Sequence, residues 1–188
     1  MDTYSSFKDL KAAELSYCIE CRDRNAHITI LAPHGGNIEP HTSEIATLVA
    51  ADKYNLFCFN GLKPSNNKVL HITSHKYDEE QATTLVRSSD FVIAIHGCTQ
   101  IDKMVFIGGL YTELKQGIAA ALGRAEIPCV ICDKTSPYRG HNPENICNRG
   151  ITGKGVQLEI SRPLRDSPQA WRKIAAAINE ALDSLDVE

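Results

Sequence analysis

An apolar run that stops at a Pro-His-Gly-Gly turn constrains the fold of this chain more than any other feature. The run spans residues 27–33 and is followed by His34-Gly35-Gly36. β-Branched residues predict a strand, and glycine lets the backbone take positive φ and approach a ligand closely. The imidazole of His34 is therefore expected at the carboxyl end of a strand, where open α/β sheets bind their ligands.

A carboxylate follows this histidine, and a second strand repeats the design. Glu39 lies five residues after His34, and the apolar run at 91–95 ends in His96. Two imidazoles and one carboxylate are a known ligand set for catalytic zinc, which keeps its fourth position for water. Each histidine alone would more commonly be a hydrogen-bonded loop residue. Together, the pattern predicts that His34, Glu39 and His96 bind Zn²⁺.

Length and composition limit the other possibilities. A chain of 188 residues can bury a sizeable core, so we expect a single domain over residues 1–188. Seven cysteines and no apolar leader predict synthesis in the cytoplasm, without a signal peptide and without a disulfide framework. The formal charge of -3 argues against nucleic-acid binding. No run approaches the roughly 20 apolar residues of a membrane span.

Hydrophobic periodicity predicts alternating strands and helices. Strands are expected at 16–21, 27–33, 56–59, 69–72, 91–96, 104–107, 127–132 and 155–160, and helices at 6–14, 42–54, 78–89, 111–124 and 168–182. A polar stretch of five residues separates the first two strands, which predicts an antiparallel hairpin. The later alternation predicts an α/β fold with a mixed, mostly parallel central sheet flanked by helices.

The last predicted strand carries a carboxylate among apolar residues. Alternation places Gln157 and Glu159 on the face opposite the apolar side chains. In one interpretation, Glu159 pairs with a surface arginine on an edge strand. In the other, it is the general base that takes a proton from the water that zinc activates. The arginines nearest to it in sequence are Arg149, Arg162 and Arg165, which are candidates to bind a substrate carboxylate.

Loops supply further candidates for substrate contact. Residues 133–149 form a long connection rich in Asp, Ser, Pro, Asn and Arg, and loops of this length in compact domains tend to be functional. Arg139 and His141 within it are therefore candidates. His71 and His75 lie close to the carboxyl end of another predicted strand. For these two histidines, a solvated loop and a place in the cleft are both open interpretations.

Four segments carry a resemblance to a known family: APHGGNIEPHTSEIA (32–46), AIHGC (94–98), NICNRG (145–150) and GVQLEI (155–160). They resemble the zinc-dependent poly-γ-glutamate hydrolases of bacteriophages of bacilli and their bacterial relatives. The likeness implies a fold similar to that of zinc carboxypeptidases, with His34, Glu39 and His96 as zinc ligands and Glu159 as the catalytic carboxylate. His41 departs from the pattern, because glycine is expected there in relatives.

The resemblance also implies a function. The enzyme would cleave γ-glutamyl amide bonds in poly-γ-glutamate, helping a phage through a host capsule and acting outside the cell after lysis. Every residue of that polymer carries a free α-carboxylate, so the site needs local cations, with Arg149 and Arg162 as candidates. Two other functions stay open: a zinc amidohydrolase of a small N-acyl amino acid, and a non-enzymatic phage accessory protein whose structural metal has four protein ligands.

Overall fold

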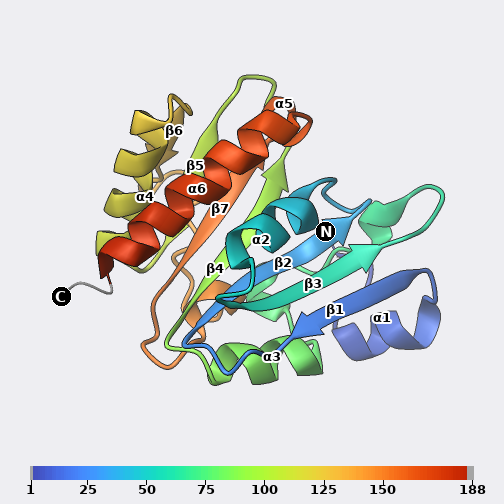
Figure 1. Cartoon of the computed structure of the whole chain (residues 1–188). Helices are drawn as coiled ribbons and strands as arrows, with labels where there is room; N and C mark the ends of the chain where they lie inside the picture. Colours follow the sequence, from blue (N-terminus) through green and yellow to red (C-terminus); the bar gives the residue numbers. More distant parts are fainter. Residues whose placement is uncertain (1, 186–188) are drawn as a thin grey trace.

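A seven-stranded sheet organises the structure, a computed structural model that describes residues 2–185 (Figure 1). The strands are β1 (Tyr17–Arg22), β2 (Ile28–Gly36), β3 (Asn55–Gly61), β4 (Phe91–Cys98), β5 (Val105–Gly109), β6 (Cys129–Ile131) and β7 (Gly155–Ser161). The α-helices are α1 (Phe7–Ala13), α2 (Thr42–Ala50), α3 (Glu80–Arg87), α4 (Thr112–Arg124), α5 (Arg162–Arg165) and α6 (Pro168–Leu185). Short 3₁₀ helices cover Asn67–Leu70, Ser74–Lys76 and Ile146–Asn148. The predicted α/β class is confirmed.

The strands follow the spatial order β1-β3-β2-β4-β7-β5-β6. The central strands β3, β2, β4 and β7 run parallel, whereas β1 joins β3 and β5 joins β7 in antiparallel orientation. The predicted hairpin between 16–21 and 27–33 is wrong, because β3 lies between β1 and β2. β2 is buried along almost its whole length, while β1 is only partly buried. A strand buried on both faces takes a central place between parallel neighbours, which leaves the edge to β1.

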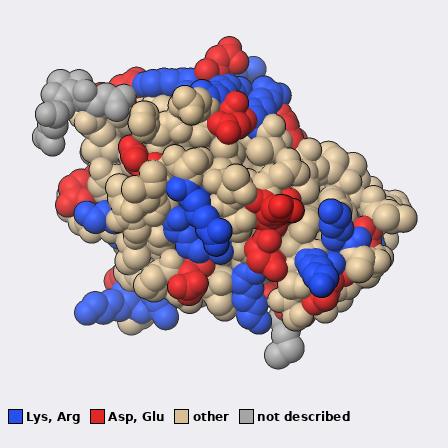
Figure 2. All heavy atoms as spheres, turned by 90° about the horizontal axis from the view of Figure 1, so that it is seen from below, with Lys and Arg blue, Asp and Glu red and all other residues tan. Residues whose placement is uncertain are grey.

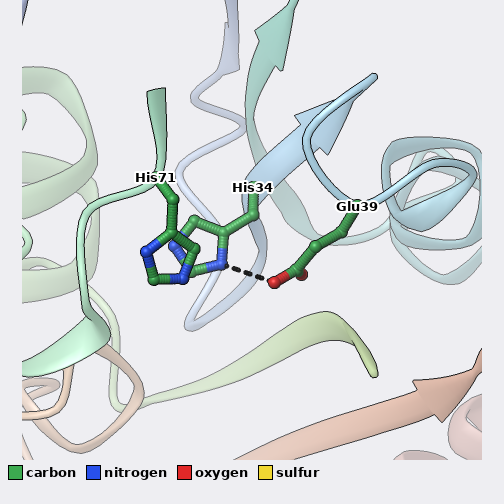
Figure 3. A group of neighbouring side chains, drawn as sticks. All are labelled: His34, Glu39 and His71. Atoms are coloured by element: carbon green, nitrogen blue, oxygen red, sulfur yellow. Dashed lines mark ion pairs between the residues drawn. The ribbon is translucent and has the colours of Figure 1, made fainter. Parts of the chain in front are cut away.

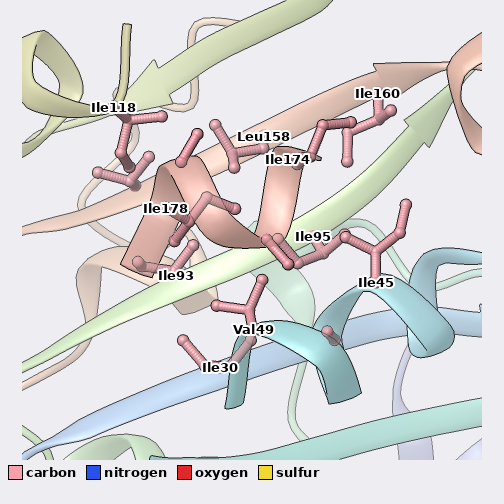
Figure 4. Packing of buried hydrophobic residues seen from close by; sticks show 14 of the residues in the cluster. Ile30, Ile45, Val49, Ile93, Ile95, Ile118, Leu158, Ile160, Ile174 and Ile178 are labelled. Atoms are coloured by element: carbon pink, nitrogen blue, oxygen red, sulfur yellow. The ribbon is translucent and has the colours of Figure 1, made fainter. Parts of the chain in front are cut away.

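Side chains alternate between the two covered faces of the central strands. Ile93 and Ile95 of β4 belong to the cluster that includes side chains of α2, α4 and α6 (Figure 4). Val92 and Ala94 belong to the cluster that includes side chains of α1 and α3. This double burial explains why the sequence of β4 is an apolar run rather than an alternation of apolar and polar residues.

The strand predicted at 69–72 is also wrong. The segment Asn67–Leu70 is a 3₁₀ helix, and the Asn67 side chain both accepts from the N–H and donates to the carbonyl of Lys63. Ile72 is still buried, with 1% of its surface exposed. The apolar pattern therefore correctly indicated burial. The backbone nevertheless forms a turn, because the Asn67 side chain bonds the backbone of Lys63.

No helix within residues 2–185 is long and apolar enough to cross a lipid bilayer. On the face that Figure 2 draws, basic side chains stand close to acidic ones. Charges of both signs are thus interspersed on this face.

Candidate metal centre

Two adjacent parallel strands and one tight turn bring the predicted ligands together. β2 and β4 pair in parallel, so that His34 and His96 reach the same edge of the sheet. The chain then folds back, because the N–H of Glu39 donates to the carbonyl of His34 at 2.8 Å. Gly36 permits this turn, since its φ is +59° and a Cβ there would lie 2.6 Å from the carbonyl oxygen of Gly61.

The three side chains converge on one point. Nδ1 of His34 lies 3.1 Å from Oε1 of Glu39 (Figure 3) and 3.2 Å from Nδ1 of His96. Nδ1 of His96 lies 3.7 Å from Oε2 of Glu39. Bonds of about 2.0–2.1 Å to one tetrahedral zinc ion place its ligand atoms roughly 3.3–3.4 Å apart. The spacings between the two imidazole nitrogens and the two carboxylate oxygens, 3.1–3.7 Å, are therefore close to those around a single ion of that size.

The donor chemistry of the cluster also fits a cation. Nε2 of His34 lies 2.8 Å from the carbonyl oxygen of Ile72. A carbonyl can only accept, so Nε2 of the neutral ring carries the proton and Nδ1 presents a lone pair toward Glu39. Burial would raise the pKa of Glu39, but His34 and His96, when their imidazoles carry a proton toward the carboxylate in place of a metal ion, hold it well below its usual range. Acceptors that face one another in this way need a shared proton or metal ion between them.

Glu159 stands beside this cluster on an interior strand. β7 lies between β4 and β5, and its register places Glu159 opposite His96. The interpretation of Glu159 as an ion-paired residue on an edge strand is therefore wrong. Burial raises the pKa of Glu159, and the negative charge of Glu39 raises it further, whereas His96 and His34 act in the opposite direction. A carboxyl group with a raised pKa beside a candidate metal site is suited to proton transfer.

Two cavities meet at the cluster. The first has a volume of about 450 Å³ and is lined by His34, Glu39, His96 and Glu159 together with loop residues that include Arg139 and His141. The second has a volume of about 410 Å³ and is lined on its basic side by Lys68, Arg162 and Arg165. Glu39 and His71 line both cavities. The two cavities thus share Glu39 and His71 as part of their walls.

The predicted substrate-binding arginines lie in different places. Arg162 lines the second cavity, where its Nε is 2.6 Å from the Asp166 carboxylate. Arg149 lines neither cavity, and its guanidinium donates to the carbonyl of Tyr77. Arg139, the loop candidate, lines the first cavity. The structure therefore gives Arg139 and Arg162, but not Arg149, access to the cleft.

His71 adds a third imidazole that the sequence left open. Its ring stacks on that of His34 with 4.0 Å between the ring centroids (Figure 3). Ligand atoms of His71, His34 and Glu39 all lie within 4.8 Å of one another. Nδ1 of His71 is 3.0 Å from the Asp2 carboxylate, and a carboxylate so placed fixes the orientation of an imidazole. The wrong strand prediction for this segment hid the approach of His71 to the cluster.

Fold and site together define an α/β protein with a candidate metal centre at the carboxyl ends of its parallel strands, next to a partly buried glutamate. The chain belongs to the poly-gamma-glutamate hydrolase family, whose family model matches residues 4–177.

Two solved structures resemble this one closely. A bacteriophage poly-gamma-glutamate hydrolase has a TM-score of 0.92 and 32% sequence identity, with 100% of both chains covered. A zinc-free structure of YndL has a TM-score of 0.93 and 28% identity, covering 98% of this chain and 99% of the other. An N-acetylmuramoyl-L-alanine amidase of Nostoc punctiforme, with a TM-score of 0.51 and 13% identity, shares the fold alone.

Curated relatives come from Bacillus subtilis (strain 168). UPF0714 protein YndL is 34% identical over 168 residues, which is 88% of this chain and 66% of the relative. SPbeta prophage-derived UPF0714 protein YoqZ is 39% identical over 166 residues, 87% of this chain and 60% of the relative. The chain therefore spans less than two thirds of the length of these two relatives.

Proposed function

We propose that this chain is a zinc-dependent hydrolase that cleaves γ-glutamyl amide bonds in poly-γ-glutamate. The observation that carries the proposal is the convergence of His34, Glu39 and His96 on one point beside Glu159. Membership of the poly-gamma-glutamate hydrolase family supports the polymer as substrate. The zinc-free form of a similar structure, YndL, supports zinc as the metal.

The residues divide the chemistry between them. Nδ1 of His34, the Glu39 carboxylate and Nδ1 of His96 would hold the ion. Zinc, when bound, supplies a Lewis acid that polarises the scissile carbonyl and lowers the pKa of water. Glu159 takes the proton from the attacking water and delivers it to the departing amine. Burial raises its pKa, which makes it a stronger base toward the attacking water.

The shape and charge of the cleft favour a polymer over a small N-acyl amino acid. The two cavities share Glu39 and His71, so a polymer long enough to fill both would pass the cluster. Each γ-linked residue brings an α-carboxylate, for which Arg139 is available in the first cavity and Lys68 and Arg162 in the second. Substrate binding by Arg149 stays a prediction that no cavity contact supports.

Capsule depolymerisation is the biological role that we attach to this activity. A phage that meets a poly-γ-glutamate capsule needs an enzyme outside the host cell, and release by lysis would place it there. The support is the bacteriophage source of a similar poly-gamma-glutamate hydrolase structure.

Polymer digestion with and without metal tests the proposal. The protein should shorten poly-γ-glutamate, lose this activity after treatment with a chelator and regain it with Zn²⁺. Substitution of Glu159 should leave zinc bound and abolish turnover. Unchanged activity in the chelated protein would overturn the zinc assignment, and full activity of Glu159→Gln would overturn the role of Glu159. A zinc-loaded protein that cleaves only small N-acyl amino acids would favour the alternative amidohydrolase.

A further inference from the structure

A buried arginine behind the candidate metal centre is the strongest feature outside the proposed chemistry. Arg165 ends the short helix α5 and has 3% of its surface exposed. Its Nε donates to the carbonyl of Ile160 at 2.9 Å, and its Nη2 donates to the carbonyl of Cys98 at 3.1 Å. Its Nη1 donates to the carbonyl of Pro40. One guanidinium thus bonds three segments that are far apart in the sequence.

These three carbonyls belong to the segments that carry the site. One lies directly after Glu39, one directly after Glu159, and the third two residues after His96. We propose that Arg165 is a positioning residue that fixes the distances between the metal-binding carboxylate, the metal-binding imidazole and the general base. The inference rests on the proposed metal site but not on the identity of the substrate.

Arginine is suited to this task. A guanidinium is planar, stays charged and presents five donors in a rigid fork, whereas a lysine ammonium is a compact point charge. A buried charge is costly unless it is hydrogen-bonded and has an opposite charge nearby. Three carbonyls accept from the guanidinium, and the Glu39 carboxylate supplies the opposite charge. The indole Nε1 of Trp171 donates to the carbonyl of Arg165 at 2.5 Å, which fixes the backbone from which the side chain starts.

Gly97 leaves room for the same guanidinium, because it has no side chain. A Cβ at Gly97 would lie 2.5 Å from Cζ and 2.6 Å from Nε of Arg165, so a larger residue would displace the group. The N–H of Gly97 also donates to Oε2 of Glu39 at 2.8 Å. The guanidinium therefore packs against the turn that holds the candidate carboxylate ligand, and this amide reports whether the carboxylate is in place.

Hydrogen exchange of the Gly97 amide in the metal-free protein tests the proposal directly. In Arg165→Ala, the Glu39 segment should lose its anchor, and Gly97 should exchange about tenfold faster or more, because a hydrogen bond to a charged group is lost. Arg165→Lys, which keeps the charge but not the fork, should give a smaller increase. Exchange of core amides in β4 should be unchanged in both variants.

Arg24 provides a matched control. Its guanidinium also bonds backbone carbonyls, those of Tyr54 at 2.6 Å and Ala51 at 2.8 Å, but it lines neither cavity of the cleft. Arg24→Ala should lower thermal stability and leave Gly97 exchange unchanged. A purely structural role for Arg165 predicts instead that Arg165→Ala behaves like Arg24→Ala, lowering stability without a selective effect on Gly97 exchange.

Zinc affinity is the second readout. Competition with a chromogenic chelator should show Arg165→Ala binding Zn²⁺ about 10–100-fold more weakly, as is usual when a residue that orients ligands is removed, and Arg24→Ala binding it normally. Millimolar guanidinium ion should restore part of the loss in Arg165→Ala. Wild-type zinc affinity with wild-type Gly97 exchange in both Arg165 variants would overturn the inference. If wild-type protein bound no zinc, the proposed function would fail, and Gly97 exchange would still decide the role of Arg165.

Discussion

The cleft is built from two kinds of wall, one made of strand ends and one made of loops. His34 and His96, both near strand ends, are 2% exposed, and parallel pairing sets their positions. Arg139 lies in a long connection and is exposed. Groups on rigid elements are held within small tolerances, whereas groups on loops adapt to what they bind. We therefore expect the strand wall to determine turnover and metal binding, and the loop wall to determine substrate affinity.

The largest effect should come from Glu159→Gln on the strand wall. An amide of the same shape cannot accept the proton of the attacking water, so kcat should fall about 10²–10⁴-fold. KM for poly-γ-glutamate and bound zinc should stay close to those of the wild type, as measured by steady-state kinetics and metal analysis. Glu113→Gln, on the first turn of α4, is the matched control and should keep full activity. A fall in KM alone would contradict the assignment.

The next effect separates the strand-borne imidazole from the loop-borne one. His96→Ala should weaken zinc binding at least about 100-fold, because it removes a ligand. His71→Ala should weaken it less than about tenfold, because its neighbour His34 keeps the bond to the Ile72 carbonyl. Titration with a competing chelator measures both. Equal losses in the two variants would indicate four protein ligands and so favour the structural-metal alternative.

A smaller effect is expected on the loop wall. Arg139→Ala should raise KM for the polymer about 3- to 10-fold and leave kcat unchanged, because one charge-assisted contact to an α-carboxylate is lost. Raising the ionic strength should shrink the difference between variant and wild type. Arg124→Ala removes an arginine paired with Glu180 on the surface and serves as control. An altered kcat would show that the loop wall also positions the scissile bond.

The same division explains what the sequence could predict. Apolar runs that end in histidine or carry an isolated carboxylate identified β2, β4 and β7 together with His34, His96 and Glu159. Parallel strands that end at one edge bring such residues together whatever the details of the loops.

The rest depended on contacts between distant segments. No local sequence pattern predicts that β3 separates β1 from β2. Pairing partners are decided by which strand must be buried on both faces. His71 reaches the cluster through a 3₁₀ turn and an Asp2 carboxylate nearly seventy positions away, which periodicity does not register. Arg165 bonds three segments at once, and only their assembly reveals it.

The smallest effect is expected at His41, where the sequence departs from the glycine expected in relatives. Its φ is +74°, a conformation that costs a non-glycine residue about 1–2 kcal/mol. The ring packs 4.9 Å from that of Trp171 between centroids and lines neither cavity. His41→Gly relieves the backbone but loses this contact and frees the unfolded chain, so the opposing terms should nearly cancel.

Denaturant unfolding should therefore place His41→Gly within about 1 kcal/mol of the wild type, with zinc affinity and KM unchanged. His41→Ala keeps the positive φ without the ring and should be the less stable of the two, because it retains the strain and loses the packing. If His41→Gly altered KM instead, the His41 side chain would contribute to substrate binding. The loop wall would then include the start of α2.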